Sequence, residues 1–154
     1  MNIAICSGYF NPVHKGHIDY LLSAKKLADE LIVIVNSDKQ VKQKGSTSFM
    51  KESERLYIVR SLKPVDCAVV SLDKDMSVCE TLRLIYDMRP DAQEIVFANG
   101  GDRKEDDVPE YDICHLLGIK MAFNVGGEKT QSSSDLLATS QIGTKTKNLY
   151  PYCR

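Results

Sequence analysis

Five short apolar runs, separated by longer polar or amphipathic stretches, most limit how this chain can fold. They are NIAIC (2–6), LIVIVN (31–36), CAVVSL (67–72), EIVFAN (94–99) and IKMAFN (119–124). The second run is too apolar and too β-branched for a surface element, so it predicts a strand buried on both faces. Strands that alternate with crossover segments indicate right-handed βαβ units. The sequence therefore predicts an α/β fold with a doubly wound, five-stranded parallel sheet.

The segments between these runs predict the helices. Apolar residues recur at helical spacing from His17 to Glu30, and helices are also expected at 51–62, 76–88 and 108–117. The last would have Pro109 in its first turn and Gly118 as its C-cap. The stretch 38–51 (DKQVKQKGSTSFMK) shows neither period and carries four lysines, so we expect a long loop. We predict one domain over 1–142, followed by a C-terminal tail over 143–154.

Composition narrows the class of partner. With 154 residues, 43% hydrophobic residues and a formal charge of −1, the chain is typical of one globular domain without a basic nucleic-acid tail. No run approaches the 18 apolar residues of a membrane span, and the start of the chain lacks the basic region of a signal peptide. We therefore expect a cytoplasmic protein that binds small molecules, not nucleic acid or membranes.

The five cysteines point to reduced thiols, because their number is odd and no CxxC pair occurs. Cys6, Cys67 and Cys79 lie inside apolar segments, so we expect them to be buried. None is assigned a catalytic role, and no protein-bound metal site is predicted.

Chemistry in such a sheet is expected in the loops at the carboxyl ends of the strands. The first of them reads GYFNPVHKGH (8–17) and holds two of the three histidines of the chain. Gly8 and Gly16 permit close backbone approach, and the amide of Asn11 can donate to an anion. His14 and His17 lie three residues apart where a helix begins, so both imidazoles can face one phosphate group. The alternative is two surface histidines in a turn.

This stretch resembles the HxGH signature, G-x-F-[DN]-x-x-H-x-G-H, of the cytidylyltransferase-like nucleotidyltransferase superfamily. The most similar members are glycerol-3-phosphate cytidylyltransferase and heptose 1-phosphate adenylyltransferase, and the likeness covers residues 1 to 138. The resemblance implies a Rossmann-like fold in which His14 and His17 are catalytic, because the family's histidines contact the triphosphate and stabilise the transition state. Homodimers are common in the family, so a homodimer is expected.

Other loops fit the same resemblance. SDKQVKQKG (37–45) is similar to the family's lysine-bearing loop, which makes Lys42 a phosphate-binding candidate and Lys44 a catalytic one. ANGGDR (98–103) resembles the family's GGD segment, which implies that Asp102 lies near the ribose or metal and Arg103 near a phosphate. KTQSSSDLL (129–137) aligns with the RTxGISTS motif, although the arginine and glycine of that motif have no clear match. The nucleotide- or phosphate-binding candidates are Gly8, Tyr9, Phe10, Asn11, Gly16, Lys42, Gly101, Asp102, Arg103, Lys129, Thr130, Ser132, Ser133 and Ser134.

Plainer interpretations stay open for several of these residues. The lysines of 38–51 fit a solvated loop, the three serines fit a helix N-cap, and Tyr9 and Phe10 fit packing roles, which for Phe10 is the preferred interpretation. His115 lies within a predicted helix and is expected to be an ordinary structural or surface residue, and 105–107 an exposed acidic turn.

The residues and the resemblance together predict a nucleotidyltransferase. It would move a nucleoside monophosphate from CTP or ATP to a small phosphorylated sugar or polyol, of the glycerol-3-phosphate or heptose-1-phosphate type, and release pyrophosphate. Mg²⁺ is expected as a cofactor bound through the nucleotide triphosphate. The alternative is a catalytically silent nucleotide-binding sensor of the same fold.

Overall fold

The structure is a computed structural model that describes residues 1–101 and 103–127. These residues form a five-stranded parallel sheet of order β3-β2-β1-β4-β5, which confirms the predicted α/β, Rossmann-like fold class. The strands are β1 (Asn2–Gly8), β2 (Glu30–Val35), β3 (Cys67–Val70), β4 (Glu94–Gly100) and β5 (Lys120–Val125). The helices are α1 (Lys15–Lys25), α2 (Asp38–Gln43), α3 (Glu52–Arg60), α4 (Cys79–Met88) and α5 (Tyr111–Leu117), with a 3₁₀ turn at Glu105–Asp107.

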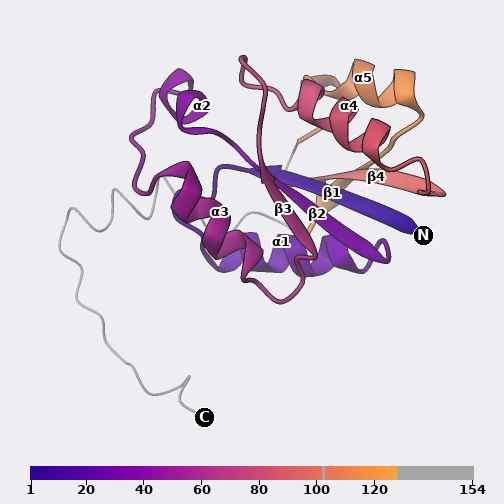
Figure 1. Ribbon diagram of the computed structural model, residues 1–154, viewed down its shortest axis with the longest axis horizontal. Coiled ribbons are helices and arrows are strands. Elements are labelled where there is room, and N and C mark those ends of the chain that lie inside the picture. The colour runs from indigo at the N-terminus through magenta and orange to yellow at the C-terminus, as the bar shows by residue number, and fades with distance from the viewer. Residues whose placement is uncertain (102, 128–154) are drawn as a thin grey trace, which may run out of the picture.

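Helices cover both faces of the sheet, with α4 and α5 on one face and α1 and α3 on the other (Figure 1). Because side chains alternate along a strand, β1 and β2 contribute to two separate cores. Ile3 and Ile34 pack with Leu82 of α4, whereas Ala4 packs with Leu21 of α1. Burial of β2 on both faces follows, as its apolar sequence predicted. Within the described residues, no helix combines the length and apolarity that crossing a membrane requires.

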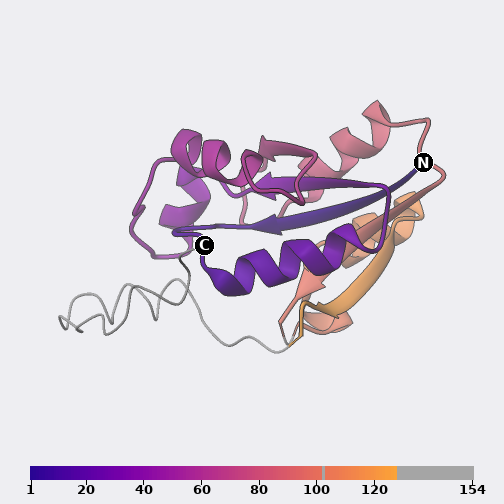
Figure 2. The same cartoon turned by 90° about the horizontal axis from the view of Figure 1, so that it is seen from below.

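The order of the strands brings four loops to one edge of the sheet. β1 lies between β2 and β4, so the chain reverses its winding direction there. Gly8 is paired with Val35 in register, and all five strands run the same way. The loops after β1, β2, β3 and β4 therefore emerge together, beside the start of α1, which Figure 2 shows running alongside β1. A shared edge of this kind is where parallel sheets bind ligands.

The prediction of an unbroken loop over 38–51 is wrong, because residues Asp38–Gln43 form α2. Its first turn is a capping box: the Ser37 hydroxyl accepts from the Gln40 N–H, and the Gln40 side chain accepts from the Ser37 N–H. Gln40 and Val41 are buried, so tertiary contacts stabilise this short helix. The S-x-x-Q spacing of a capping box is present in the sequence, but the four lysines of 38–51 favoured the prediction of a loop.

Two further helices differ from the sequence expectation. α1 begins at Lys15 and ends at Lys25, so Gly16 lies inside the helix and the predicted last turn is missing. α5 begins at Tyr111, so Pro109 precedes the helix, although Gly118 is the left-handed C-cap as predicted, with φ of 72°. Boundaries shift because a local apolar period does not show where capping side chains sit.

The burial of the cysteines is also only partly as predicted. Cys6 is buried, but Cys79 is half-buried and Cys67 is exposed. Cys67 is the exposed first residue of β3, which is one of the two edge strands of the sheet. An apolar run marks a strand correctly but does not show which of its ends is covered.

Candidate active site

The two histidines begin α1 and cap each other's backbone. His14 is the N-cap residue, and its Nδ1 accepts the Gly16 N–H at 3.0 Å. The Nδ1 of His17 accepts the His14 N–H at 3.2 Å, and the two rings stack with their centroids 3.8 Å apart. Because Nδ1 of each ring is an acceptor, the proton of each neutral imidazole lies on Nε2. The helix start therefore carries two aligned Nε2–H donors at the positive end of its dipole.

Gly16 is required by this arrangement. A Cβ on Gly16 would lie 2.9 Å from Cε1 of His14, which would push the ring away from the helix start. The sequence predicted that Gly16 permits close backbone approach. In the structure, Gly16 also leaves room for the ring of His14.

Phe10 lies beneath the histidines. Its side chain is fully buried, and its ring meets the His17 ring edge-on with centroids 4.9 Å apart. Its backbone has a positive φ of 51°, and a Cβ on Gly8 would lie 2.9 Å from its ring. These contacts favour the packing interpretation of Phe10 over a direct ligand contact.

The amide of Asn11 contacts protein backbone. Asn11 is buried; its Nδ2 donates to the Thr47 carbonyl at 2.9 Å, and its Oδ1 accepts from the N–H groups of Phe49 and Met50 at 2.7 and 3.3 Å. The residue that was expected to bind an anion thus fastens the segment after α2 to the first loop.

Arg55 of α3, which the sequence analysis missed, holds the centre of the same assembly. It is fully buried, and its Nη1 donates to the carbonyls of Tyr9 and Asn36, each at 2.7 Å. Its Nε donates to the Met50 carbonyl at 3.0 Å, and its Nη2 pairs with Asp38 at 2.9 Å. Partial burial of the Asp38 carboxyl would raise its pKa, but hydrogen bonds, among them the one from Arg55, and the charge of Arg55 hold that pKa below its ordinary value. The signal was periodicity: Arg55 stands four residues before buried Val59, on the core side of α3.

Gln40 fixes α2 against the loop after β3. Its Nε2 donates to the carbonyls of Asp75 and Ser77 at 2.7 and 2.8 Å. The candidate lysines of α2 and its C-cap, Lys42 and Lys44, are exposed, and Nζ of Lys44 lies 4.4 Å from the centroid of the Tyr9 ring. The structure therefore brings Lys44 to the first loop from a separate element.

The β4 side of the site carries a buried carboxyl group. Glu110, at the start of α5, is 3% exposed; its Oε1 accepts the Val78 N–H at 3.0 Å, and its Oε2 has no hydrogen-bond partner in the part of the chain that the structure describes. Burial raises the pKa of Glu110, while the charge of Arg103 opposes this shift. Burial likewise raises the pKa of Tyr9, which feels the charges of both Arg103 and Glu110. The exposed Arg103 thus lies within electrostatic reach of Tyr9.

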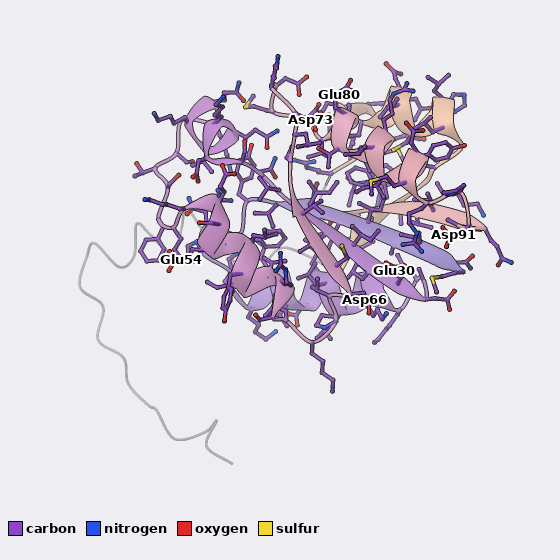
Figure 3. The ribbon with its side chains drawn as sticks, in the orientation of Figure 1. Glu30, Glu54, Asp66, Asp73, Glu80 and Asp91 are labelled. Carbon is purple, nitrogen blue, oxygen red and sulfur yellow. The ribbon has the colours of Figure 1, made fainter. Side chains whose placement is uncertain are left out.

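Most acidic side chains near the sheet have structural partners. Figure 3 shows Asp73 and Glu80 at the start of α4, whereas Glu30, Asp66 and Asp91 lie toward the opposite edge. Asp73 caps α4 by accepting from the backbone N–H groups of Glu80 and Thr81 at 2.7 and 3.1 Å. Among the described residues, no group of three or more histidine, cysteine, aspartate or glutamate side chains could hold a metal ion.

Two of the described cysteines, Cys6 and Cys114, are buried. Burial raises the pKa of both Cys6 and Cys114 to about 12, so these groups stay protonated. His115 is exposed and stacks on Tyr111, with the centroids 6.1 Å apart, as expected of an ordinary surface residue.

The remaining candidates divide between described and undescribed positions. Gly101 has a positive φ of 67°, which turns the chain at the end of β4. At the end of β5, a Cβ on Gly126 would lie 2.8 Å from Cα of Tyr20 in α1, so the chain passes directly against that helix. Six candidates lie outside the described residues: Asp102, Lys129, Thr130, Ser132, Ser133 and Ser134. The predicted tail over 143–154 also lies outside them.

Comparison with known proteins places this geometry in a family. Residues 5–136 match the family model described as Cytidylyltransferase-like. An FAD synthase of Aciduliprofundum boonei is 36% identical over 90% of this chain and 85% of its own length. The bifunctional protein HldE of Blochmanniella floridana is 35% identical over 91% of this chain, which spans 28% of that longer protein.

A solved structure agrees with these sequence relatives. The lipopolysaccharide core biosynthesis protein from Thermoplasma volcanium superimposes with a TM-score of 0.62 at 31% identity, over 80% of this chain and 93% of that one. The family match covers most of the described sheet and includes both histidines. The chain therefore belongs to the cytidylyltransferase-like family of nucleotidyltransferases.

Proposed function

We propose that this enzyme transfers a nucleoside monophosphate from ATP or CTP to a small phosphorylated sugar or polyol and releases pyrophosphate. The observation that supports this most is the pair of Nε2–H donors that His14 and His17 present side by side at the start of α1. Nucleotidyl transfer needs donors aimed at phosphate oxygens more than it needs covalent catalysis.

In the proposed reaction, a phosphate oxygen of the acceptor attacks the α-phosphorus in line. A new P–O bond joins acceptor and nucleotide, and the bond from the α-phosphorus to the bridging oxygen breaks, so pyrophosphate leaves with that oxygen. His14 and His17 stabilise the charge that grows on the phosphate oxygens. Lys44 and Lys42 hold the acceptor phosphate and the triphosphate, and Arg103 binds a phosphate from the β4 side. The rings stay aligned because each is fixed through its Nδ1.

Mg²⁺ fits this site as an ion that is bound through the nucleotide triphosphate. The histidines and lysines described at the sheet edge are hydrogen-bond donors, and among the described residues no group of three or more acidic, histidine or cysteine side chains could hold an ion alone. The ion would neutralise charge between the phosphates, while Asp102, outside the described residues, is the family-derived candidate for contact with it.

ATP is the favoured donor of the two. The relatives named FAD synthase make a product that contains an adenylate joined through pyrophosphate, and several of them match most of this chain. The same names favour FMN as a second candidate acceptor, since FMN is also a phosphomonoester. We further propose a homodimer, as the family resemblance suggests.

Pyrophosphate release tests the proposed function. The purified protein is incubated with Mg²⁺ and either ATP or CTP, in turn with glycerol 3-phosphate, heptose 1-phosphate and FMN. We expect turnover with ATP and one sugar or polyol phosphate. Turnover with FMN alone would replace the acceptor class, and tight nucleotide binding without any turnover would support the silent sensor instead. Size-exclusion chromatography with light scattering tests the homodimer.

A further inference from the structure

Lys44 meets the first loop through an aromatic ring. It is the C-cap of α2, its side chain is exposed, and its Nζ lies 4.4 Å from the centroid of the Tyr9 ring. A lysine carries four flexible side-chain bonds, so an exposed ammonium group samples many positions unless a partner restricts it. A ring face within about 6 Å attracts such a cation and restricts it.

The ring that attracts Lys44 is itself held in place. The carbonyl of Tyr9 accepts a hydrogen bond from buried Arg55 at 2.7 Å, and the next residue, Phe10, is fully buried with a positive φ. The hydroxyl end of Tyr9 lies within electrostatic reach of Arg103 and Glu110 on the β4 side. The Tyr9 ring therefore stands on a fixed backbone between two sides of the site.

The backbone of Lys44 is held equally well. Its N–H donates to the Gln40 carbonyl at 3.0 Å, and the Gln40 side chain fastens α2 to the loop after β3. Both backbones are therefore fixed, and the Tyr9 ring is a partner that restricts the side chain of Lys44, which carries the charge.

We propose that Tyr9 is a positioning residue that holds the Lys44 ammonium group over the first loop, where it meets the phosphate of the acceptor. This inference rests on the proposed function through the role of Lys44, and it changes the part assigned to Tyr9 from binding a ligand to orienting a lysine. An ammonium held in place binds a phosphate with a smaller loss of side-chain entropy, so the effect falls on acceptor affinity.

Kinetics of paired variants test the proposal. Replacement Y9L removes the ring, and we expect the KM for the acceptor to rise about three- to tenfold, with the KM for the nucleotide changed less than twofold. Y9F keeps the ring and is expected to recover most of that loss. K44M removes the ammonium group, and in the K44M background Y9L should add no further rise. The proposal would be overturned if the increases in acceptor KM from Y9L and K44M multiplied in the double variant. It would also be overturned if Y9F and Y9L raised the acceptor KM equally.

A second measurement does not depend on turnover. In protein labelled with ¹³C-lysine, we expect the Hε protons of Lys44 to show an upfield ring-current shift that persists in Y9F and disappears in Y9L. Thermal unfolding of each variant shows whether it is folded. If the shift is present but the wild type releases no pyrophosphate with any acceptor, the proposed function fails and the contact stands. If the shift is absent in the wild type, the positioning role fails whatever the activity.

Discussion

The two sides of the site use buried polar side chains in opposite ways. On the β2 side, Arg55, Gln40 and Asn11 are buried, and each makes several hydrogen bonds to backbone groups of neighbouring loops. On the β4 side, Glu110 is buried with one oxygen bonded to Val78 and the other without a partner among the described residues.

The difference shows which side is built to be rigid. A satisfied buried network fixes the loops that it joins, and the β2 side carries the first loop and the two candidate lysines. A buried carboxyl oxygen without a partner costs free energy, more so when the group is charged. The buried carboxyl group of the β4 side thus lowers the stability of the fold, whereas the buried network of the β2 side raises it. Three substitutions test this contrast.

The largest effect on stability is expected from Arg55→Leu. The change removes five donors, so the carbonyls of Tyr9, Asn36 and Met50 lose their hydrogen bonds to Arg55, and we expect a loss of about 3–5 kcal/mol in the free energy of unfolding. Urea denaturation measures it. Arg60→Leu, on the exposed end of α3, is the matched control and should change stability by less than about 0.5 kcal/mol. If Arg55→Leu and Arg60→Leu lowered the free energy of unfolding equally, the buried network would not be what makes the β2 side rigid.

The next effect concerns catalysis. In His17→Asn the side-chain oxygen can replace Nδ1 as acceptor of the His14 N–H, but no group replaces the Nε2–H donor. We expect kcat to fall by about 10² to 10³ while the melting temperature stays near that of the wild type. His17→Gln, which can place an amide donor near the position of Nε2, should retain more activity. A fully active His17→Asn enzyme would contradict the proposed role of His17.

The smallest effect is expected from Glu110→Gln, and it depends on pH. Burial raises the pKa of Glu110 in the folded protein, so the folded state binds more protons than the unfolded state once the pH exceeds the ordinary glutamate pKa. The contribution of this group to stability is therefore complete at low pH and is lost as the pH rises through the folded pKa.

The matching measurement is a melting-temperature series from pH 4 to 8. Glu110→Gln cannot ionise, so its melting temperature should gain on that of the wild type by a few degrees as the pH rises. Glu105→Gln, an exposed acid in the 3₁₀ turn, should show a constant difference. A difference that shrinks with rising pH would show that the Glu110 carboxylate is satisfied in the folded protein.

Much of the fold could be predicted because apolar runs and their spacing are local properties. All five strands lie where LIVIVN and the similar runs stand, within a few residues. The helix α2 has a local signal in its S-x-x-Q capping box, but a helix this short also depends on the contacts of Gln40 with Asp75 and Ser77, which are about 35 residues away in the chain. No local period carries information about such contacts.

The site shows the same limit at the level of single residues. The spacing of His14 and His17 predicted that both imidazoles face the same side, because both lie on one short stretch, and the structure shows the two rings stacked. The sequence could not show that Asn11 faces backbone 36 to 39 residues away, or that Arg55 connects three loops, because these contacts depend on how strands are ordered in the sheet. Residue type predicted an anion contact for Asn11, and the structure adds the hydrogen bonds of its amide to Thr47, Phe49 and Met50.

The close passage of Gly126 against Tyr20 sets a fixed register along α1. The same helix carries His17 at its start and, three residues later, the backbone against which the chain leaves β5. Insertion of one residue between these points would rotate them by about 100° relative to each other. The stretch from His17 to Tyr20 is therefore the part of α1 whose length cannot change without rotating His17 relative to the point where Gly126 passes the helix.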